Sequence, residues 1–306
     1  MSGLYRTSWV HQHRSANGTI NARFLMPATL FVVATPIGNL EDITVRALRV
    51  LREVSVIAAE DTRRTAHLLA RYAITTPTTS LHEHNEAGKS ASLVARLQRG
   101  ESVALVSDAG TPTVSDPGGL LIRAAIDAGI RVEPIPGPSA VLTALAASGL
   151  PTDSFTFLGF PPTRSKDRIA WFDKVRRLRG TVVLFESPNR IQSTLRDIHH
   201  TLGECQVAVG RELTKIHEEF VRGPISAVAQ REFTNLGEFT VVLDIGLIPE
   251  NAASPVTSEQ AIVAEFGVMT KTNGLTRRMA ISSIGRKHGL AANRVYEILE
   301  AAKKSG

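Results

Sequence analysis

Short apolar runs rich in β-branched residues alternate with longer amphipathic runs over the first half of this 306-residue chain. Residues 30–34 (LFVVA) and 103–107 (VALVS) are typical of strands, whereas residues 44–54 place apolar side chains at helical spacing. Strands of about five residues that alternate with helices of about ten predict βαβ units and a mainly parallel sheet. The sequence therefore predicts an α/β fold.

The alternation is interrupted at residues 148–155 (SGLPTDSF), which predicts the end of an N-terminal α/β domain. The last strand-like runs beyond this point are separated by only short segments, which predicts a second α/β domain with some antiparallel pairing. The expected order is a disordered arm or mis-assigned start at 1–25, domains at 26–150 and 151–248, a linker at 249–258 and a helical module at 259–306.

Composition excludes several classes of protein. The longest apolar run has five residues, far fewer than the roughly 18 to 20 that span a bilayer, so no membrane partner is expected. The lone Cys205 rules out an internal disulfide framework and a thiolate-rich metal site. These features predict a soluble, cytoplasmic protein.

Three loops rich in glycine and proline follow strand-like runs, at residues 34–44, 108–119 and 136–140. Ligand sites in open parallel sheets lie at the carboxyl ends of strands. Glycine permits close backbone approach and proline stiffens a loop, so the three loops together predict a preformed ligand cradle. Plain turn chemistry remains the alternative for any single loop.

Standard nucleotide and metal motifs are missing or incomplete. No G-x-G-x-x-G follows the first strand, and the P-loop-like run at 88–90 has Glu83 where the leading glycine belongs, which argues against NAD and ATP. No metal is expected, because a polar pocket or surface explains the alternating His82, His84 and Glu86 better than a ligand set does.

Seven segments, in this order, resemble the tetrapyrrole methylase-like family and specifically its ribosomal RNA branch: TPIGNLEDIT, AEDTRRT, SDAGTPTVSDPGG, PIPGPSA, LGFPP, FESPNRI and VGRELTKIHEEFVRG. The resemblance runs from about Ala28 to Ile248. It implies two α/β domains with S-adenosylmethionine in the cleft between them. It also implies methylation of the ribose 2′-oxygen of a decoding-centre cytidine in small-subunit rRNA. Ala-Gly-Thr-Pro at 109–112, where the tetrapyrrole enzymes read Gly-Asp-Pro, favours the RNA branch.

The resemblance also implies which residues contact the cofactor. Those in the three loops are Pro36, Gly38, Asn39, Asp108, Gly110, Thr111, Ser139 and Ala140. Leu184 and the segment after it would close the adenine side from the second domain.

Methyl transfer mainly requires alignment of the reactants, and a carboxylate, histidine or cation can assist loss of the hydroxyl proton. Candidates by location are Glu60, Arg63, His82, Asn85, Glu186, Asn189 and Arg190. A salt bridge or helix cap is the alternative for each of them, and Asp61 stands where an N-cap belongs.

The formal net charge of +6 is concentrated at the two ends and in one internal segment, residues 163–180, which carries +5. Phosphate binding is the functional interpretation and a solvated helix face the alternative. The C-terminal module is expected to be a helix-turn-helix-like rRNA-docking element, or else a helical dimer or packing element. Candidate RNA-binding residues are Arg164, Lys166, Arg168, Lys174, Arg176, Arg177, Arg277, Arg278, Arg286 and Lys287.

Three hypotheses therefore stand: an rRNA ribose methyltransferase, a small-molecule methyltransferase of the tetrapyrrole type, and a non-enzymatic RNA-binding adaptor. The expected partner is small-subunit rRNA or the 30S particle. DNA is not expected, because the reaction needs an RNA ribose. The resemblance suggests a homodimer.

Overall fold

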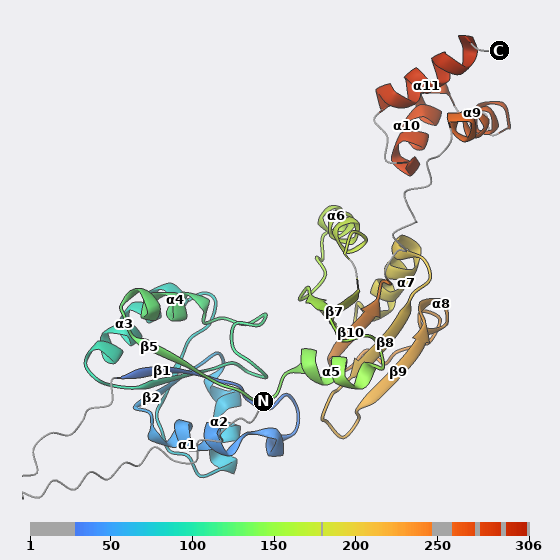
Figure 1. Cartoon of the computed structure of the whole chain (residues 1–306). Coiled ribbons are helices and arrows are strands. Elements are labelled where there is room, and N and C mark those ends of the chain that lie inside the picture. Colours follow the sequence, from blue (N-terminus) through green and yellow to red (C-terminus); the bar gives the residue numbers. More distant parts are fainter. Residues whose placement is uncertain (1–27, 179, 247–258, 273–275, 289–291, 305–306) are drawn as a thin grey trace, which may run out of the picture. The chain divides into compact units, whose positions relative to one another are not determined.

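The computed structural model describes residues 28–178, 180–246, 259–272, 276–288 and 292–304 (Figure 1). Contacts between residues divide the chain into two compact units, 1–245 and 246–306. The arm predicted at 1–25 and the linker predicted at 249–258 lie outside the described residues.

The first sheet of the larger unit is parallel throughout, with strand order β3-β2-β4-β1-β5. This arrangement confirms the predicted α/β fold with a parallel sheet. Its strands are β1 (Thr29–Val33), β2 (Val56–Ala59), β3 (Thr78–Ser80), β4 (Val103–Val106) and β5 (Arg131–Ile135).

Helices cover both faces of this sheet, two on each (Figure 1). Val56 and Ala58 of β2 pack among residues of one pair, and Ile57 and Ala59 among residues of the other, because successive strand side chains point to opposite faces. All four are buried, as is typical of a strand covered on both sides. The pairs are α1 (Val45–Glu53) with α2 (Thr62–Arg71), and α3 (Glu86–Gln98) with α4 (Gly119–Asp127).

The second sheet is mixed, with order β6-β7-β10-β8-β9. β6 runs parallel to β7, while the other neighbouring strands are antiparallel, which confirms the predicted antiparallel character. The strands are β6 (Phe155–Phe157), β7 (Thr181–Glu186), β8 (Gln206–Arg211), β9 (Glu219–Pro224) and β10 (Phe239–Asp244).

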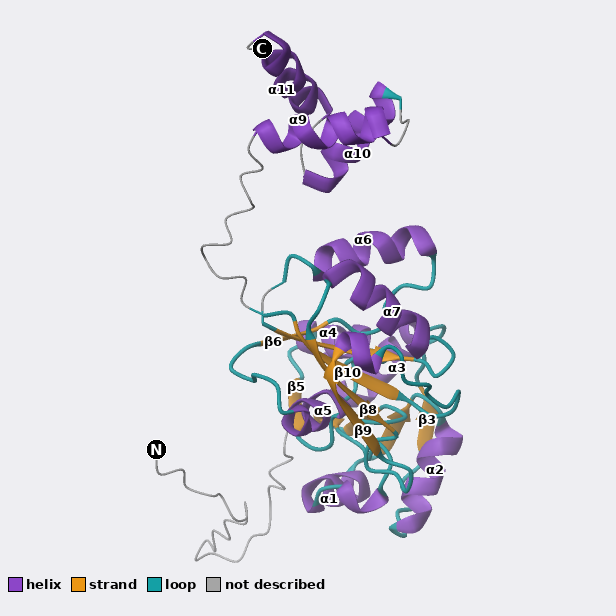
Figure 2. Cartoon of the chain, turned by 90° about the vertical axis from the view of Figure 1, so that its right-hand side faces the viewer, coloured by secondary structure: helices purple, strands orange, loops and turns teal. Residues whose placement is uncertain are grey.

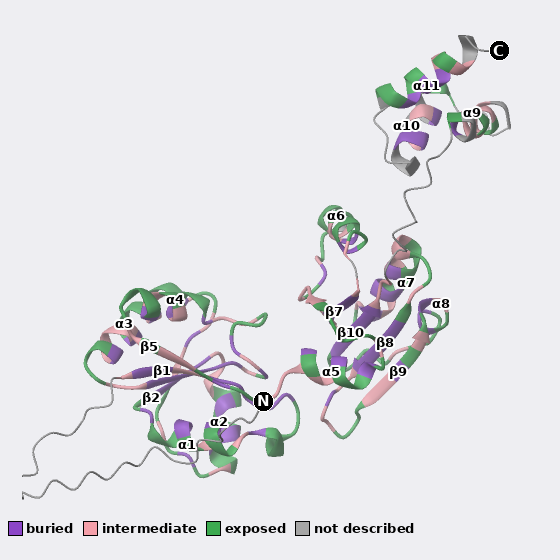
Figure 3. Ribbon diagram, in the orientation of Figure 1, coloured by how far each residue is buried: buried purple, intermediate pink, exposed green. Residues whose placement is uncertain are grey.

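One cluster of buried apolar side chains combines residues that follow strands of the first sheet with residues of the second sheet. α5 (Ala140–Ser148) follows β5 of the first sheet, yet its Val141 and Leu145 pack with Val183 and Val242 of the second. The opposite face of the second sheet is covered by three helices, and the central strands of both sheets are the most buried part of the larger unit (Figure 3). These helices are α6 (Ser165–Val175), α7 (Ile191–Leu202) and α8 (Ile225–Val228).

The smaller unit consists of helices in the residues that the structure describes (Figure 2). Its own hydrophobic core contains Ile262, Ile284, Val295, Ile298 and Leu299. The sequence of the helix-turn-helix-like module places its turn at His288-Gly289-Leu290, which falls largely outside the described part of the chain. No described helix of either unit is long and apolar enough to span a membrane. The elements are α9 (Glu259–Gly267), the π-helical turn η2 (Val268–Thr272), α10 (Arg277–His288) and α11 (Ala292–Lys304).

Candidate active site

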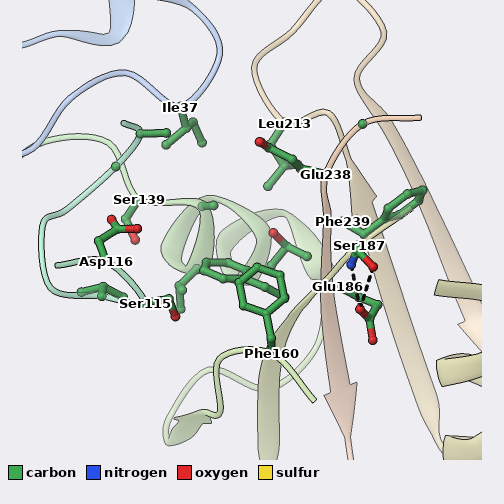
Figure 4. A pocket seen from close by; sticks show the side chains of 18 of the residues that line it. Ile37, Ser115, Asp116, Ser139, Phe160, Glu186, Ser187, Leu213, Glu238 and Phe239 are labelled. Carbon is green, nitrogen blue, oxygen red and sulfur yellow. Dashed lines mark hydrogen bonds between the residues drawn. The ribbon is translucent and has the colours of Figure 1, made fainter. Parts of the chain in front are cut away.

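A cavity of about 310 Å³ lies where the carboxyl ends of three strands of the first sheet meet loops of the second (Figure 4). Its size is at the lower end of the range for small-molecule sites. From the first sheet it is lined by Ile37 and residues 109–111, 114–116 and 139–141. From the second sheet it is lined by Phe160, Leu213 and residues 185–188 and 237–240.

The loops after β1 and β4 are joined by backbone hydrogen bonds. Thr35 N donates to Gly110 O (2.9 Å) and Gly110 N donates to Thr35 O (3.0 Å), while the Thr35 hydroxyl donates to Ser107 O (3.2 Å). Gly110 has φ +79°, in the left-handed region that favours glycine. These hydrogen bonds fix the two loops against each other.

Four of the predicted cofactor residues line the cavity: Gly110, Thr111, Ser139 and Ala140. Ser139 also caps α5, because its hydroxyl accepts a hydrogen bond from Leu142 N (3.5 Å). The loops after β4 and β5 thus line one cavity, and Ile37 is the residue of the loop after β1 that lines it.

The other five predicted cofactor residues do not line this cavity. Pro36 is buried and the Asn39 side chain caps the short helix η1 (Leu40–Asp42). Leu184 is fully buried in the core of the second sheet, so its neighbours Phe185 and Glu186 line the cavity instead. Asp108 is held by a charged cluster, described below.

Gly38 packs against the turn after β8 rather than facing the cavity. A Cβ atom built on Gly38 would lie 2.5 Å from Lys215 Cγ and 2.8 Å from Leu213 O, so no side chain fits there without a shift. The same turn holds Glu212 and Thr214 at φ +50° and +66°. The glycine therefore serves the close approach of two loops.

Asp108 sits among charged groups that follow β2. Its Oδ1 accepts a hydrogen bond from Asp61 N (3.0 Å), its Oδ2 lies 3.4 Å from Arg64 Nη1, and its own N–H donates to Glu60 Oε2 (3.2 Å). Burial raises the pKa of Glu60, against the effect of that hydrogen bond. Glu60 and Asp108 thus anchor the loop after β4 to the loop after β2.

Asp61 and Arg63 form a local pair at the start of α2. The Asp61 carboxylate accepts from Arg63 N (2.8 Å), which confirms the N-cap interpretation. It also pairs with the Arg63 guanidinium at 2.8 Å, and the hydrogen bonds from Arg63 lower the pKa of Asp61. The Arg63 side chain is 89% exposed, and neither residue lines the cavity.

Asp116, in the loop after β4, lines the cavity, although it is not among the predicted site residues. Burial raises its pKa to about 6, and the Glu60 and Asp108 carboxylates add to the effect, while a hydrogen bond from Ser107 opposes it. Ser115, beside it, has φ +70°, a strained conformation for a residue with a side chain. The only feature of the sequence that points to Asp116 is its position in the DPGG run of the loop after β4.

Glu186 reaches the cavity from the second sheet, but its carboxylate is fully engaged. Oε1 accepts from Ser187 N (2.7 Å) and pairs with Arg190 Nη2 (2.8 Å), while Oε2 accepts from the Thr194 hydroxyl (2.6 Å). The side chain is completely buried. Glu186 and Arg190 therefore form a structural anchor, and Asn189 is exposed in the turn between them.

His82 and Asn85 hold each other in the turn after β3, away from the cavity. The Asn85 side chain accepts from His82 N (2.9 Å) and lies 3.0 Å from His82 Nε2. Glu86 instead accepts hydrogen bonds from Gly118 N (3.0 Å) and Leu120 N (2.7 Å), which fixes the start of α4. No group of metal-ligating side chains is found among the described residues.

The predicted RNA-binding residues divide into three groups. Arg164, Lys166, Lys174, Arg176 and Arg177 are exposed on or beside α6. Arg168 differs from the expectation: it is turned inward, with its side chain 14% exposed and its Nε 2.7 Å from Asp197 Oδ2. In the smaller unit Arg277 pairs with Glu300, and the side chains of Arg278, Arg286 and Lys287 lie outside those described.

Comparisons with known proteins agree on one family. A family model described as "Tetrapyrrole (Corrin/Porphyrin) Methylases" matches residues 29–229. A Synechocystis sp. protein named "Ribosomal RNA small subunit methyltransferase I" is 44% identical over 273 residues, 88% of this chain and 96% of its own. A Thermotoga maritima protein of the same name is 48% identical over 216 residues, 70% of this chain and 97% of its own.

The solved structures show the same fold. A crystal structure of diphthine synthase covers 71% of this chain and 90% of its own chain, at 17% identity and a TM-score of 0.57. At this identity the likeness concerns the fold alone.

Proposed function

Because the chain belongs to the tetrapyrrole methylase family, we propose that it transfers a methyl group from S-adenosylmethionine to a ribose 2′-oxygen of small-subunit rRNA. The proposed target is a cytidine of the decoding centre. Relatives over most of the chain length are named as small-subunit rRNA methyltransferases, which supports the coarser activity. The observation that carries the proposal is the cavity where the Gly- and Pro-rich loops meet.

The cavity residues suit a ligand that is apolar and planar at one end and charged at the other. Ile37, Val141 and Leu213 offer apolar contacts, and Ser139 offers a hydroxyl. Asp116 offers a carboxylate that is mainly ionised at neutral pH, since its pKa is about 6. These residues would hold the methionine and adenosine parts of S-adenosylmethionine, and the carboxylate would favour its positive charges.

Bound S-adenosylmethionine supplies an electrophilic methyl group. The protein then has to hold the acceptor hydroxyl in line and keep water out. The paired hydrogen bonds between Thr35 and Gly110 keep the loops rigid, so they do not have to be ordered on binding. Glu186 contributes by fixing the turn after β7, because both of its oxygens already have partners.

The exposed cations on and beside α6 favour an RNA substrate over a small tetrapyrrole. Five of them are exposed within residues 164–177. Such a cluster binds phosphates with a steep dependence on salt, which a small-molecule methyltransferase would not need. A non-enzymatic adaptor would not need the preformed cavity.

The test is methyl transfer by the purified protein from labelled S-adenosylmethionine to free small-subunit rRNA and, in a separate arm, to assembled small subunits. We expect a single 2′-O-methyl group at a decoding-centre cytidine, located by mapping 2′-O-methylation along the rRNA. The control is Gly110→Trp, which would fill the cavity from a left-handed position. Methylation of a base, or full transfer by the control variant, would contradict the proposal.

We propose further that the protein works in the cytoplasm as a homodimer. The dimer rests on the family resemblance, and sedimentation of the purified chain tests it. The cytoplasm is where a bacterial rRNA methyltransferase meets its substrate, and the names of the relatives support this location.

A further inference from the structure

Phe160 is a large aromatic side chain that lines the cavity and is nevertheless 51% exposed. It lies between the Ser115 and Asp116 side and the Glu186 side (Figure 4). Its ring is tilted against that of Phe185, with centroids 5.5 Å apart, and Phe185 in turn makes an edge contact with Phe157 at 4.9 Å. Phe160 is thus the outermost ring of an aromatic row, with part of its surface open to solvent.

The loop that carries Phe160 is held on both sides of the ring. Gly159 O accepts a hydrogen bond from Phe185 N (2.9 Å), Pro161 O from Arg190 Nη1 (3.0 Å), and Pro162 O from Arg168 Nη1 (3.3 Å). Two of these donors are themselves fixed: Arg190 pairs with Glu186, and Arg168 pairs with Asp197. An exposed aromatic ring on a loop anchored in this way loses little conformational freedom when a ligand binds.

The turn into Phe160 requires a glycine. Gly159 has φ +63°, and a Cβ atom built on it would lie 3.4 Å from Ser115 Oγ. The loop therefore passes directly beside the strained loop after β4, and its conformation is not one that other residues adopt readily. The LGFPP segment is built to present one ring at the cavity.

Building on the function proposed above, we propose that Phe160 stacks on a nucleobase of the substrate RNA, at or next to the methylated nucleotide. Unpaired bases are recognised largely by stacking on aromatic side chains. α6 begins at Ser165, a few residues after the ring, and exposes Lys166 and Lys174. An RNA strand whose phosphates lie along α6 therefore passes close to the open side of Phe160.

The experiment measures KM for the rRNA substrate, free or assembled, and the cofactor dissociation constant for variants of the full chain. Phe160→Ala and Phe160→Leu are expected to raise the RNA KM about tenfold, while Phe160→Trp stays near wild type. The cofactor dissociation constant, measured by calorimetry, is expected to rise less than the RNA KM, because Phe160 lines the cavity with only part of its surface and exposes the rest to solvent. The matched control is Phe155→Leu, since Phe155 is 41% exposed on β6 and does not line the cavity.

The arms separate the possible failures. An unchanged RNA KM in Phe160→Ala overturns the stacking proposal, and so does a Phe160→Leu variant that behaves like wild type, because an aliphatic contact would then suffice. A cofactor dissociation constant that rises as much as the RNA KM also overturns it, because the stacked base would then be the adenine of the cofactor. Absence of rRNA methylation by the wild-type protein would overturn the proposed function itself, and the stacking proposal with it.

Discussion

Asp116 is a residue of the cavity whose pKa is clearly raised. It is partly buried, close enough to Glu60 and Asp108 to be affected by their charges, and its pKa is raised to about 6 mainly by burial. A carboxylate kept in such surroundings costs the folded state free energy at neutral pH. A residue that pays this cost while lining a ligand cavity is a candidate for function.

The pKa of Asp116 predicts a pH-dependent effect of one substitution. In the folded protein the pKa lies above the unfolded value of 3.8, so the stabilisation from binding a proton is complete below about pH 4 and is lost as the pH rises through about 6. Because the side chain is only partly buried, solvent screening reduces the full effect, and Asp116→Asn should gain roughly 1 kcal/mol of stability relative to wild type between pH 4.5 and pH 8. Urea unfolding at the two pH values measures this difference.

A suitable control for that measurement is Asp127→Asn, since Asp127 is an exposed aspartate at the end of α4. This substitution removes a carboxylate that does not line the cavity, so the pH-dependent gain of Asp116→Asn is measured against it. A gain for Asp116→Asn that is the same at both pH values would show that the Asp116 carboxylate does not titrate as its burial implies.

α6 illustrates what could and could not be predicted from the sequence. The cations of residues 163–180 were visible as a local excess of charge, and the strand and helix runs around them were visible as periodicity. The inward direction of Arg168 was not, because it depends on Asp197 and Thr194 of α7, more than 25 residues along the chain.

The site shows the same division between local and distant information. Its Gly- and Pro-rich loops follow predicted strands, so their convergence could be expected from sheet geometry. Phe160 lines the cavity only because the second sheet packs beside those loops, and no local pattern encodes that packing. Gly38 and Lys215 are also far apart in the sequence, so their contact could not be predicted from it.

Replacing both lysines of α6 by glutamine, Lys166→Gln with Lys174→Gln, should weaken binding to small-subunit rRNA about tenfold at low salt. Both side chains are exposed, so the loss reflects phosphate contacts and not folding. The slope of log affinity against log salt should decrease by roughly 1.5, while cofactor affinity is unchanged. Fluorescence anisotropy across a salt series measures both quantities.

The comparison for this pair is Arg123→Gln, which removes an exposed cation from α4. A general effect of net charge would shift the salt slope in both proteins. If only the control lost affinity, phosphate binding would have to be placed outside α6.

At the scale of the whole molecule, two units with separate cores share the chain. The cavity described above is lined entirely by residues of the 1–245 unit, whereas the core of the 246–306 unit contains none of them. Because every residue that lines the cavity belongs to the larger unit, we expect the smaller unit to contribute to substrate binding instead.

A chain that ends at Ile245 should consequently keep its cofactor site and bind RNA with lower affinity. Its cofactor dissociation constant should stay within about twofold of the full chain, because no cavity residue is removed. Its affinity for small-subunit rRNA should fall at least tenfold, because two linked modules bind one long polyanion more tightly than either alone. The removed segment carries eight of the basic residues and only five acidic ones, so the salt slope should also become shallower. Calorimetry with S-adenosylmethionine measures the cofactor affinity, and RNA binding across a salt series measures the RNA affinity and the salt slope.

Loss of cofactor binding on truncation would mean that the smaller unit supports the active site. Undiminished RNA affinity would mean that α6 and its surroundings bind the substrate alone.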